Sequence, residues 1–109
     1  MLIQLTKEND KETVKAAIGD ILSLALESNP TTGFDWALDT IGEGLLAVRE
    51  NKFEAGESAA IGAGGKRVFR FETMKPGRGQ IKLKYMRSWE GDGSIRDRFS
   101  LTIEVAAER

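Results

Sequence analysis

Regular alternation of apolar and polar residues in the last third of the chain is the feature that most restricts its fold. Ile81, Leu83 and Tyr85 are separated by lysines, and the segment 99–105 repeats the pattern with Phe, Leu, Ile and Val. A two-residue period places successive side chains on opposite faces of a β-strand. Both segments are therefore predicted to be strands with one buried face and one solvated face.

Further strand candidates precede these two and are separated by turn sequences. They are rich in apolar residues and comprise segments 2–5, 34–38, 45–50 and 68–71. Within them, Trp36 is predicted to lie in the core. Residues 51–65 are predicted to form a long connection, because small residues dominate there. Many short strands with turns at regular spacing predict an antiparallel β-sandwich or barrel.

Residues 12–27 give conflicting signals. The apolar residues from Val14 to Ala25 fit one face of a helix. However, Gly19-Asp20 is a turn pair, and the leucines at 22, 24 and 26 alternate with other residues as in a strand. On periodicity alone the helix is slightly favoured.

The composition removes several classes of function. The chain has 109 residues, which predicts one domain spanning residues 1–109, and it contains no Cys and no His. Their absence excludes Cys/His nucleophilic catalysis, Ser-His-Asp triads and zinc sites built from thiolate or imidazole. We therefore expect no enzyme, no cofactor and no metal site.

The sequence also bears on location and partners. The N-terminus lacks a basic segment followed by an apolar one, and no run of about 18 apolar residues occurs. A cytoplasmic location without membrane contact is expected, unless a signal has been removed. Lys82 and Lys84 have no interleaved aromatic residues on their face, so nucleic-acid binding is not expected. A monomer is expected.

Two pairs of acidic residues invite an acid–base or metal-binding interpretation. They are Asp35 with Asp39 and Glu43 with Glu50. Asp35 and Asp39 fall on the outward face of an alternating strand, and no dense cluster of oxygen ligands surrounds either pair. A solvated strand face is the better explanation.

Asn29-Pro30-Thr31-Thr32-Gly33-Phe34, here called the Thr loop, has strong turn chemistry. Pro30 fixes its own φ and moves Asn29 away from the helical region, and Gly33 can adopt positive φ without strain. The local sequence predicts a connection between two strands. These six residues do not decide whether the connection has a further role.

A second unusual loop contains Gly62, Ala63, Gly64 and Gly65, here called the Gly loop. It does not match a phosphate-binding loop, because Ala60 and Arg67 stand where a Walker sequence needs Gly and Ser or Thr. It is predicted to be a flexible connection whose glycines let the backbone approach another surface closely.

Trp89 lies in residues 87–94, here called the Trp loop, between charged residues and two glycines. A Trp in such a loop can be an exposed anchor for a partner, since Trp is enriched among interface hot spots. It can equally fold back on the sandwich. The sequence favours neither.

The three loops are predicted to lie together. In a simple antiparallel succession, strand direction alternates, so every second connection falls at the same end. Counted from Ile21, the three loops are connections one, three and five. They should therefore form one binding edge, as the loops of variable immunoglobulin domains do.

The sequence resembles the chagasin family of cysteine-peptidase inhibitors, whose three motifs occur in the same order. The motifs are Asn-Pro-Thr-Thr-Gly-aromatic, Gly-x-Gly-Gly and Arg-Pro-Trp. The Thr loop and the Gly loop match completely, and the third motif appears as Arg87-Ser88-Trp89, with Ser in place of Pro. The resemblance covers roughly residues 12–106.

The resemblance implies an all-β, immunoglobulin-like antiparallel β-sandwich of about seven or eight strands, with residues 12–27 forming two strands. It also implies reversible, non-covalent inhibition of papain-like cysteine peptidases. Thr31, Thr32 and Gly33 would fill the active-site cleft, the Gly loop would flank one side, and Arg87 and Trp89 the other. Without Pro at position 88, the third loop should be more mobile. The alternative function is an immunoglobulin-like binding or adhesion module that uses the same loops on a non-peptidase partner.

Overall fold

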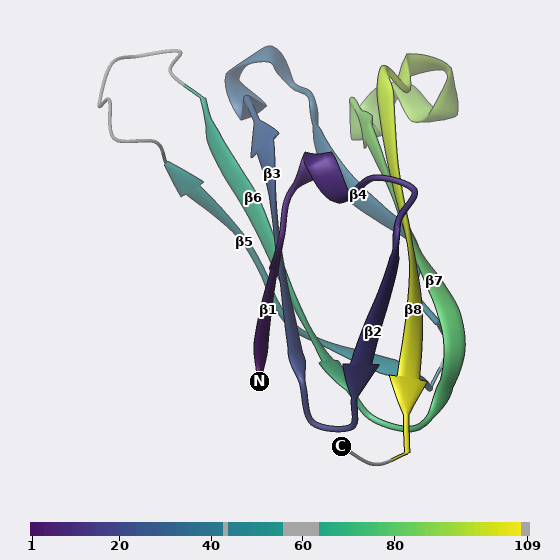
Figure 1. The fold of residues 1–109 in the computed structure, drawn as a ribbon. Helices are drawn as coiled ribbons and strands as arrows, with labels where there is room; N and C mark the ends of the chain where they lie inside the picture. Colours follow the sequence, from purple (N-terminus) through teal and green to yellow (C-terminus); the bar gives the residue numbers. More distant parts are fainter. Residues whose placement is uncertain (43, 56–63, 108–109) are drawn as a thin grey trace.

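In the computed structural model, which describes residues 1–42, 44–55 and 64–107, two four-stranded β-sheets face each other (Figure 1). One sheet has the order β1-β3-β6-β5 and the other β2-β8-β7-β4. The strands are β1 (Leu2–Leu5), β2 (Thr13–Ala17), β3 (Ile21–Ser28), β4 (Asp35–Thr40), β5 (Leu46–Ala55), β6 (Gly65–Thr73), β7 (Gly77–Met86) and β8 (Asp97–Ala106). Three 3₁₀ turns complete the described part: η1 (Lys7–Asn9), η2 (Pro30–Thr32) and η3 (Ser88–Ser94).

The predicted β-sandwich is confirmed, but its sheets are mixed and not purely antiparallel. β1 pairs with β3 in parallel, and β2 pairs with β8 in parallel. The cause is the way the first strands cross between sheets. After β1 the chain crosses through η1 to β2 and then crosses back to β3, so β3 runs in the same direction as β1 (Figure 1).

Residues 12–27 form two strands, as the family resemblance implied, and the helical periodicity was misleading. The break falls at Gly19, whose φ of 88° favours glycine. Leu22, Leu24 and Leu26 of β3 are all at most 1% exposed. Strand alternation therefore decides which side chains of this segment enter the core.

The predicted connection at residues 51–65 is wrong over its first part, because β5 continues to Ala55. Every β5 residue from Asn51 onward is exposed, although this segment pairs with β6 up to its last residue, Ala55, which lies opposite Gly65. A strand exposed on both faces shows no alternation of apolar and polar residues, so its sequence carries no strand signal. A register shift between Val48 and Glu50 interrupts the pattern further.

The core lies between the sheets and includes Trp36, as predicted. Its fully buried side chains come from both sheets and include Phe69, Phe71, Ile81, Phe99 and Ile103. Trp36 is 7% exposed, and its indole Nε1 donates a hydrogen bond to the Glu27 carbonyl at 2.9 Å. That bond joins β4 of one sheet to β3 of the other, directly below the Thr loop. No helix in the described part of the chain is long and apolar enough to span a membrane.

Candidate functional site

The Thr loop forms a closed turn that joins the end of β3 to the start of β4. Asn29 and Phe34 pair as an isolated bridge, with η2 between them. The amide of Gly33 donates to the Pro30 carbonyl at 2.9 Å, and Gly33 has a φ of 86°. Pro at the first position of the turn and Gly at its left-handed end are the residues this geometry favours. The predicted turn is therefore confirmed, and Thr31 is exposed at its tip.

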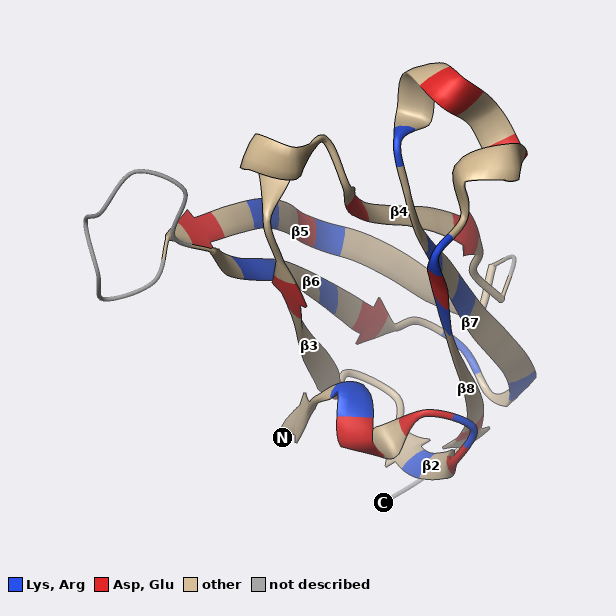
Figure 2. Cartoon of the chain, turned by 90° about the horizontal axis from the view of Figure 1, so that it is seen from above, with Lys and Arg blue, Asp and Glu red and all other residues tan. Residues whose placement is uncertain are grey.

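The tip of the Thr loop is uncharged and its hydroxyls are already paired. Thr31 Oγ1 donates to Asn29 Oδ1 at 2.5 Å, and Thr32 Oγ1 donates to the Asn29 carbonyl at 2.7 Å. Seen from above, the turn between β3 and β4 shows no Lys, Arg, Asp or Glu, whereas the Trp loop beside it does (Figure 2). The Thr loop can therefore enter a partner's cleft without desolvating a charge.

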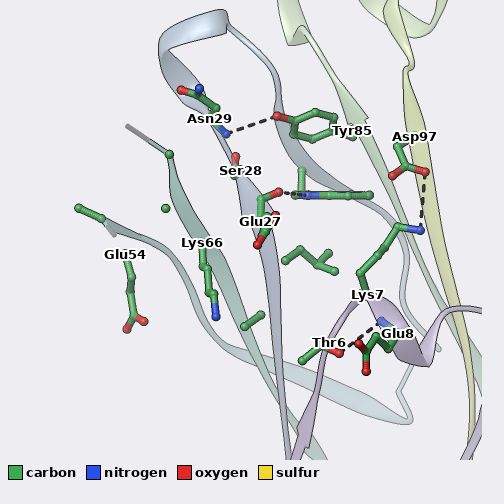
Figure 3. A pocket seen from close by; sticks show the side chains of 16 residues that line it. Thr6, Lys7, Glu8, Glu27, Ser28, Asn29, Glu54, Lys66, Tyr85 and Asp97 are labelled. Atoms are coloured by element: carbon green, nitrogen blue, oxygen red, sulfur yellow. Dashed lines mark hydrogen bonds and ion pairs between the residues drawn. The ribbon is translucent and has the colours of Figure 1, made fainter. Parts of the chain in front are cut away.

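Tyr85 supports the base of the Thr loop from β7. The Asn29 amide donates to the Tyr85 hydroxyl at 3.3 Å, across a cleft bounded farther down by Lys7 and Asp97 (Figure 3). The Tyr85 ring lies 5.6 Å from that of Phe34 and 5.1 Å from that of Trp36, centroid to centroid. These aromatic contacts continue the core up to the loop.

Asp35 does not lie on a simple solvated face, in contrast to the prediction. It accepts hydrogen bonds from Ser28 Oγ at 2.7 Å and from Arg67 Nη2 at 2.5 Å. Burial raises the pKa of the Asp35 carboxyl, but the hydrogen bonds from Arg67, Ser28 and the Trp36 amide outweigh it and hold the pKa below its ordinary value. The pair joins the two sheets beside the Thr loop. Asp39, in contrast, is exposed, as predicted.

The Trp loop is closed on itself by Ser94. The Ser94 hydroxyl accepts a hydrogen bond from the Arg87 amide at 3.0 Å and lies 2.8 Å from the Gly91 carbonyl. An ion pair of 2.8 Å between Lys84 and Asp92 ties η3 to β7. The loop therefore has a defined shape, while 71% of Trp89 remains exposed to solvent.

The Thr loop and the Trp loop contact each other directly. Arg87 Nε donates to the Thr32 carbonyl at 3.1 Å, and the Arg87 guanidinium lies 4.5 Å from the Phe34 ring centre. A Cβ atom on Gly33 would stand 2.8 Å from Trp89 Cζ2, so the indole packs against bare backbone. Trp89 is therefore both exposed and in contact with the Thr loop, and its contact with a partner stays a prediction.

The Gly loop can be placed only in part. Gly62 and Ala63 lie outside the described residues. Gly65 begins β6 and pairs with Ser28, the last residue of β3. A Cβ atom on Gly64 would lie 3.0 Å from the Ser28 carbonyl oxygen. The C-terminal end of the Gly loop therefore abuts the base of the Thr loop, and glycine is needed for the close approach.

Some residues that shape this site carried no signal in the sequence. Arg67 fixes Asp35, but in the sequence it stands out only as a mismatch to a phosphate-binding motif. Ser94, which closes the Trp loop, belongs to no motif. Within residues 1–42, 44–55 and 64–107, no group of three or more acidic side chains is arranged to hold a metal ion.

The chain is similar to known proteins over most of its length. Residues 15–103 match the profile described as "Chagasin family peptidase inhibitor I42". Over 107 residues the chain is 32% identical to Chagasin of Trypanosoma cruzi. The match covers 94% of this chain and 96% of Chagasin.

Two solved structures share the fold. The crystal structure of the cysteine protease inhibitor EhICP2 from Entamoeba histolytica matches with a TM-score of 0.87 over 96% of both chains, at 21% identity. PbICP-C in complex with falcipain-2 matches with a TM-score of 0.68 over 97% of this chain and 92% of that one, at 19% identity.

A two-sheet sandwich in which the Thr loop and the Trp loop meet at one end defines a class of loop-presenting proteins. The chain belongs to the chagasin family of peptidase inhibitors. Members of this family are inhibitors and not enzymes.

Proposed function

We propose that this protein is a reversible, non-covalent inhibitor of papain-like cysteine peptidases that inserts its Thr loop into the active-site cleft. The observation that carries the proposal is the direct contact between the Thr loop and the Trp loop. Arg87 and Trp89 hold the Thr loop from one side, so two of the three motif loops form one surface before any partner arrives. A preformed surface reduces the ordering cost of binding.

The Thr loop is unsuited to cleavage. The carbonyls of Asn29 and Pro30 accept hydrogen bonds inside the turn, and the Thr32 carbonyl accepts one from Arg87. A scissile carbonyl must be free to enter the oxyanion hole of the peptidase. A 3₁₀ turn also differs from the extended conformation in which a strand-like peptide pairs along a cleft. The loop can therefore block the nucleophile without being consumed.

The motif residues then take distinct roles. Thr31, Thr32 and Gly33 would fill the cleft, and the Gly loop would flank it mainly through backbone contacts. Trp89 would flank the other side with its exposed indole, while Arg87 would act through the Thr loop as well as at the interface. Protease–inhibitor complexes bury about 1,600 Å² in total, which three such loops can supply.

The fold neighbour PbICP-C forms a complex with falcipain-2. That complex motivates papain-like cysteine peptidases as the partner class for this chain, and EhICP2, with a higher TM-score, is itself a cysteine protease inhibitor.

The test is an inhibition panel against papain-like peptidases with Thr31→Asp and a matched control, Thr40→Asp. Both residues are exposed and belong to the same β3–β4 unit, but Thr40 lies at the far end of β4. Wild type and Thr40→Asp should inhibit competitively. Thr31→Asp should weaken inhibition on the order of 100-fold, because it places an unpaired charge in a desolvated cleft. Full peptidase activity at micromolar wild-type protein would refute the proposal.

A further inference from the structure

Phe34 is the last residue of the Thr loop, and two arginines lie over its ring: Arg87, the first residue of the Trp loop, and Arg96, two residues past its last. Phe34 is 4% exposed. The Arg87 guanidinium carbon lies 4.5 Å from the ring centre, and that of Arg96 lies 4.0 Å from it. Both distances are within the range of cation–π attraction, which is about 6 Å. Arg96 belongs to none of the three motifs.

The backbone fixes the place of Arg96. Its amide donates to the Tyr85 carbonyl at 2.8 Å, immediately before β8 begins. Tyr85 in turn contacts Phe34 and accepts from the Asn29 amide. Arg96 therefore approaches Phe34 from the same β7–β8 hairpin that supports the base of the Thr loop.

The two arginines differ in what else they bind. Arg87 also donates to the Thr32 carbonyl and pairs with Glu90 at 3.1 Å. Arg96 has no carboxylate within 4.0 Å among the residues that the structure describes. No ion pair there competes with the ring for the Arg96 guanidinium.

We propose that Arg96 is a positioning residue for inhibition. With Arg87 it forms an arginine clamp on Phe34 that fixes the Thr loop to the start of the Trp loop and to the segment that follows it. Loss of Arg96 would let the Thr loop move relative to Trp89. Part of the binding energy would then be spent on ordering the loop, and affinity would fall without the loss of any direct contact to the peptidase.

The inference rests on the proposed function for its effect on inhibition, but the clamp itself can be tested in the free protein. Arg96→Ala should speed hydrogen exchange of the Gly33 amide, which is bonded to Pro30 inside the turn. Arg98→Ala is the matched control, because Arg98 is also exposed and lies two residues farther along the chain, in β8. It removes the same charge and should leave this exchange unchanged.

The inhibition constant should rise about fivefold for Arg96→Ala and less than twofold for Arg98→Ala, with Arg96→Lys in between. In a Phe34→Leu background, Arg96→Ala should have almost no further effect, because the clamp is already open. Thermal melts establish that each variant is folded. If Phe34→Leu does not fold, the Arg96→Lys variant and the hydrogen-exchange measurement still test the clamp.

The outcomes separate the two proposals. Equal exchange and equal inhibition for the Arg96 and Arg98 alanine variants would overturn the clamp. An undiminished effect of Arg96→Ala in the Phe34→Leu background would also overturn it, since Arg96 would then touch the peptidase directly. A wild-type chain that inhibits no papain-like peptidase would refute the proposed function alone, and hydrogen exchange would still decide whether the clamp exists.

Discussion

At one end of the sandwich the β2–β3 turn and the end of β6 direct the side chains of Asp20 and Thr73 inward, whereas at the other end the Thr loop presents its hydroxyl-bearing residues to solvent. Asp20 and Thr73 are 2% and 1% exposed, and Thr73 Oγ1 donates to the Ala17 carbonyl at 2.6 Å and accepts from the Asp20 amide at 2.9 Å. We call this the sealed end. Its hydrogen bonds join buried groups and stabilise the fold.

The other end, the loop end, uses similar polar chemistry for a different purpose. Thr31 and Thr32 satisfy Asn29 inside an exposed turn, and Trp89 stays outside the core. The difference teaches that substitutions at the two ends should separate stability from binding. Changes at the sealed end should lower stability alone, and changes at the loop tips should lower inhibition alone.

After the loss of about 100-fold expected for Thr31→Asp, the largest expected effect is that of Trp89→Ala at the loop end. Trp89 is exposed in the free protein, so its removal should leave the melting temperature nearly unchanged. Inhibition should weaken by roughly 30-fold, as expected for a Trp hot spot. The measurement is the inhibition constant alongside a thermal melt. Met74→Ala, an exposed apolar residue near the sealed end, is the control and should inhibit normally.

Next in size is Thr73→Val at the sealed end. Valine keeps the shape but removes the hydroxyl that bonds the Asp20 amide and the Ala17 carbonyl in a buried position. The cost should be about 2 kcal/mol of unfolding free energy, or a melting temperature lower by roughly 10 °C. At a temperature where the variant is folded, its inhibition constant should match that of the wild type. A weaker inhibition constant there would show that the two ends are coupled.

The pair of Asp35 and Arg67 gives a smaller, pH-dependent effect. The folded-state pKa of Asp35 is lowered from its ordinary value of 3.8. Its contribution to stability is therefore complete above that value and is lost as the pH falls through the lowered folded-state pKa. Urea unfolding should be measured at a series of pH values. Below about pH 4, the free energy of unfolding should fall more steeply for wild type than for Asp35→Asn. Parallel curves for the two proteins would contradict this role.

The smallest expected effect is a gain from Ser88→Pro. Ser88 is the first residue of η3, and the preceding Arg87 has φ −92° and ψ 112°, an extended conformation that suits a residue before proline. Proline should reduce the freedom of the Trp loop and improve inhibition by about threefold, through slower dissociation. Dissociation rates from a surface-bound peptidase would measure it. Faster dissociation would show that Pro does not fit at this position.

Much of this contrast can be predicted from the sequence, because some loops and strands are specified by residues that lie within them. Pro30 and Gly33 specify their own turn, and the leucines of β3 show which face is buried. The end of β5 was missed because Lys52 and Phe53 are both exposed, so the strand has no inner and outer pattern. The parallel pairs at β1 and β2 depend on crossovers between sheets, which periodicity does not encode.

The contacts that assemble the loop end are the least predictable part. Arg67 lies 32 residues from Asp35, and Arg96 lies 62 residues from Phe34 in the sequence, and nothing local links either pair. The family motifs identify the loops that meet, but the arginine clamp depends on how the β7–β8 hairpin is placed in three dimensions.

Protection of the catalytic cysteine tests the central claim most directly. A papain-like peptidase would be treated with iodoacetamide in the presence of wild type, Thr31→Asp or Thr40→Asp, and alkylation of the catalytic cysteine followed by mass spectrometry. If the Thr loop fills the cleft, wild type and Thr40→Asp should protect the cysteine and Thr31→Asp should not. Inhibition by wild type with alkylation at the uninhibited rate would place the inhibitor elsewhere on the peptidase and contradict the account.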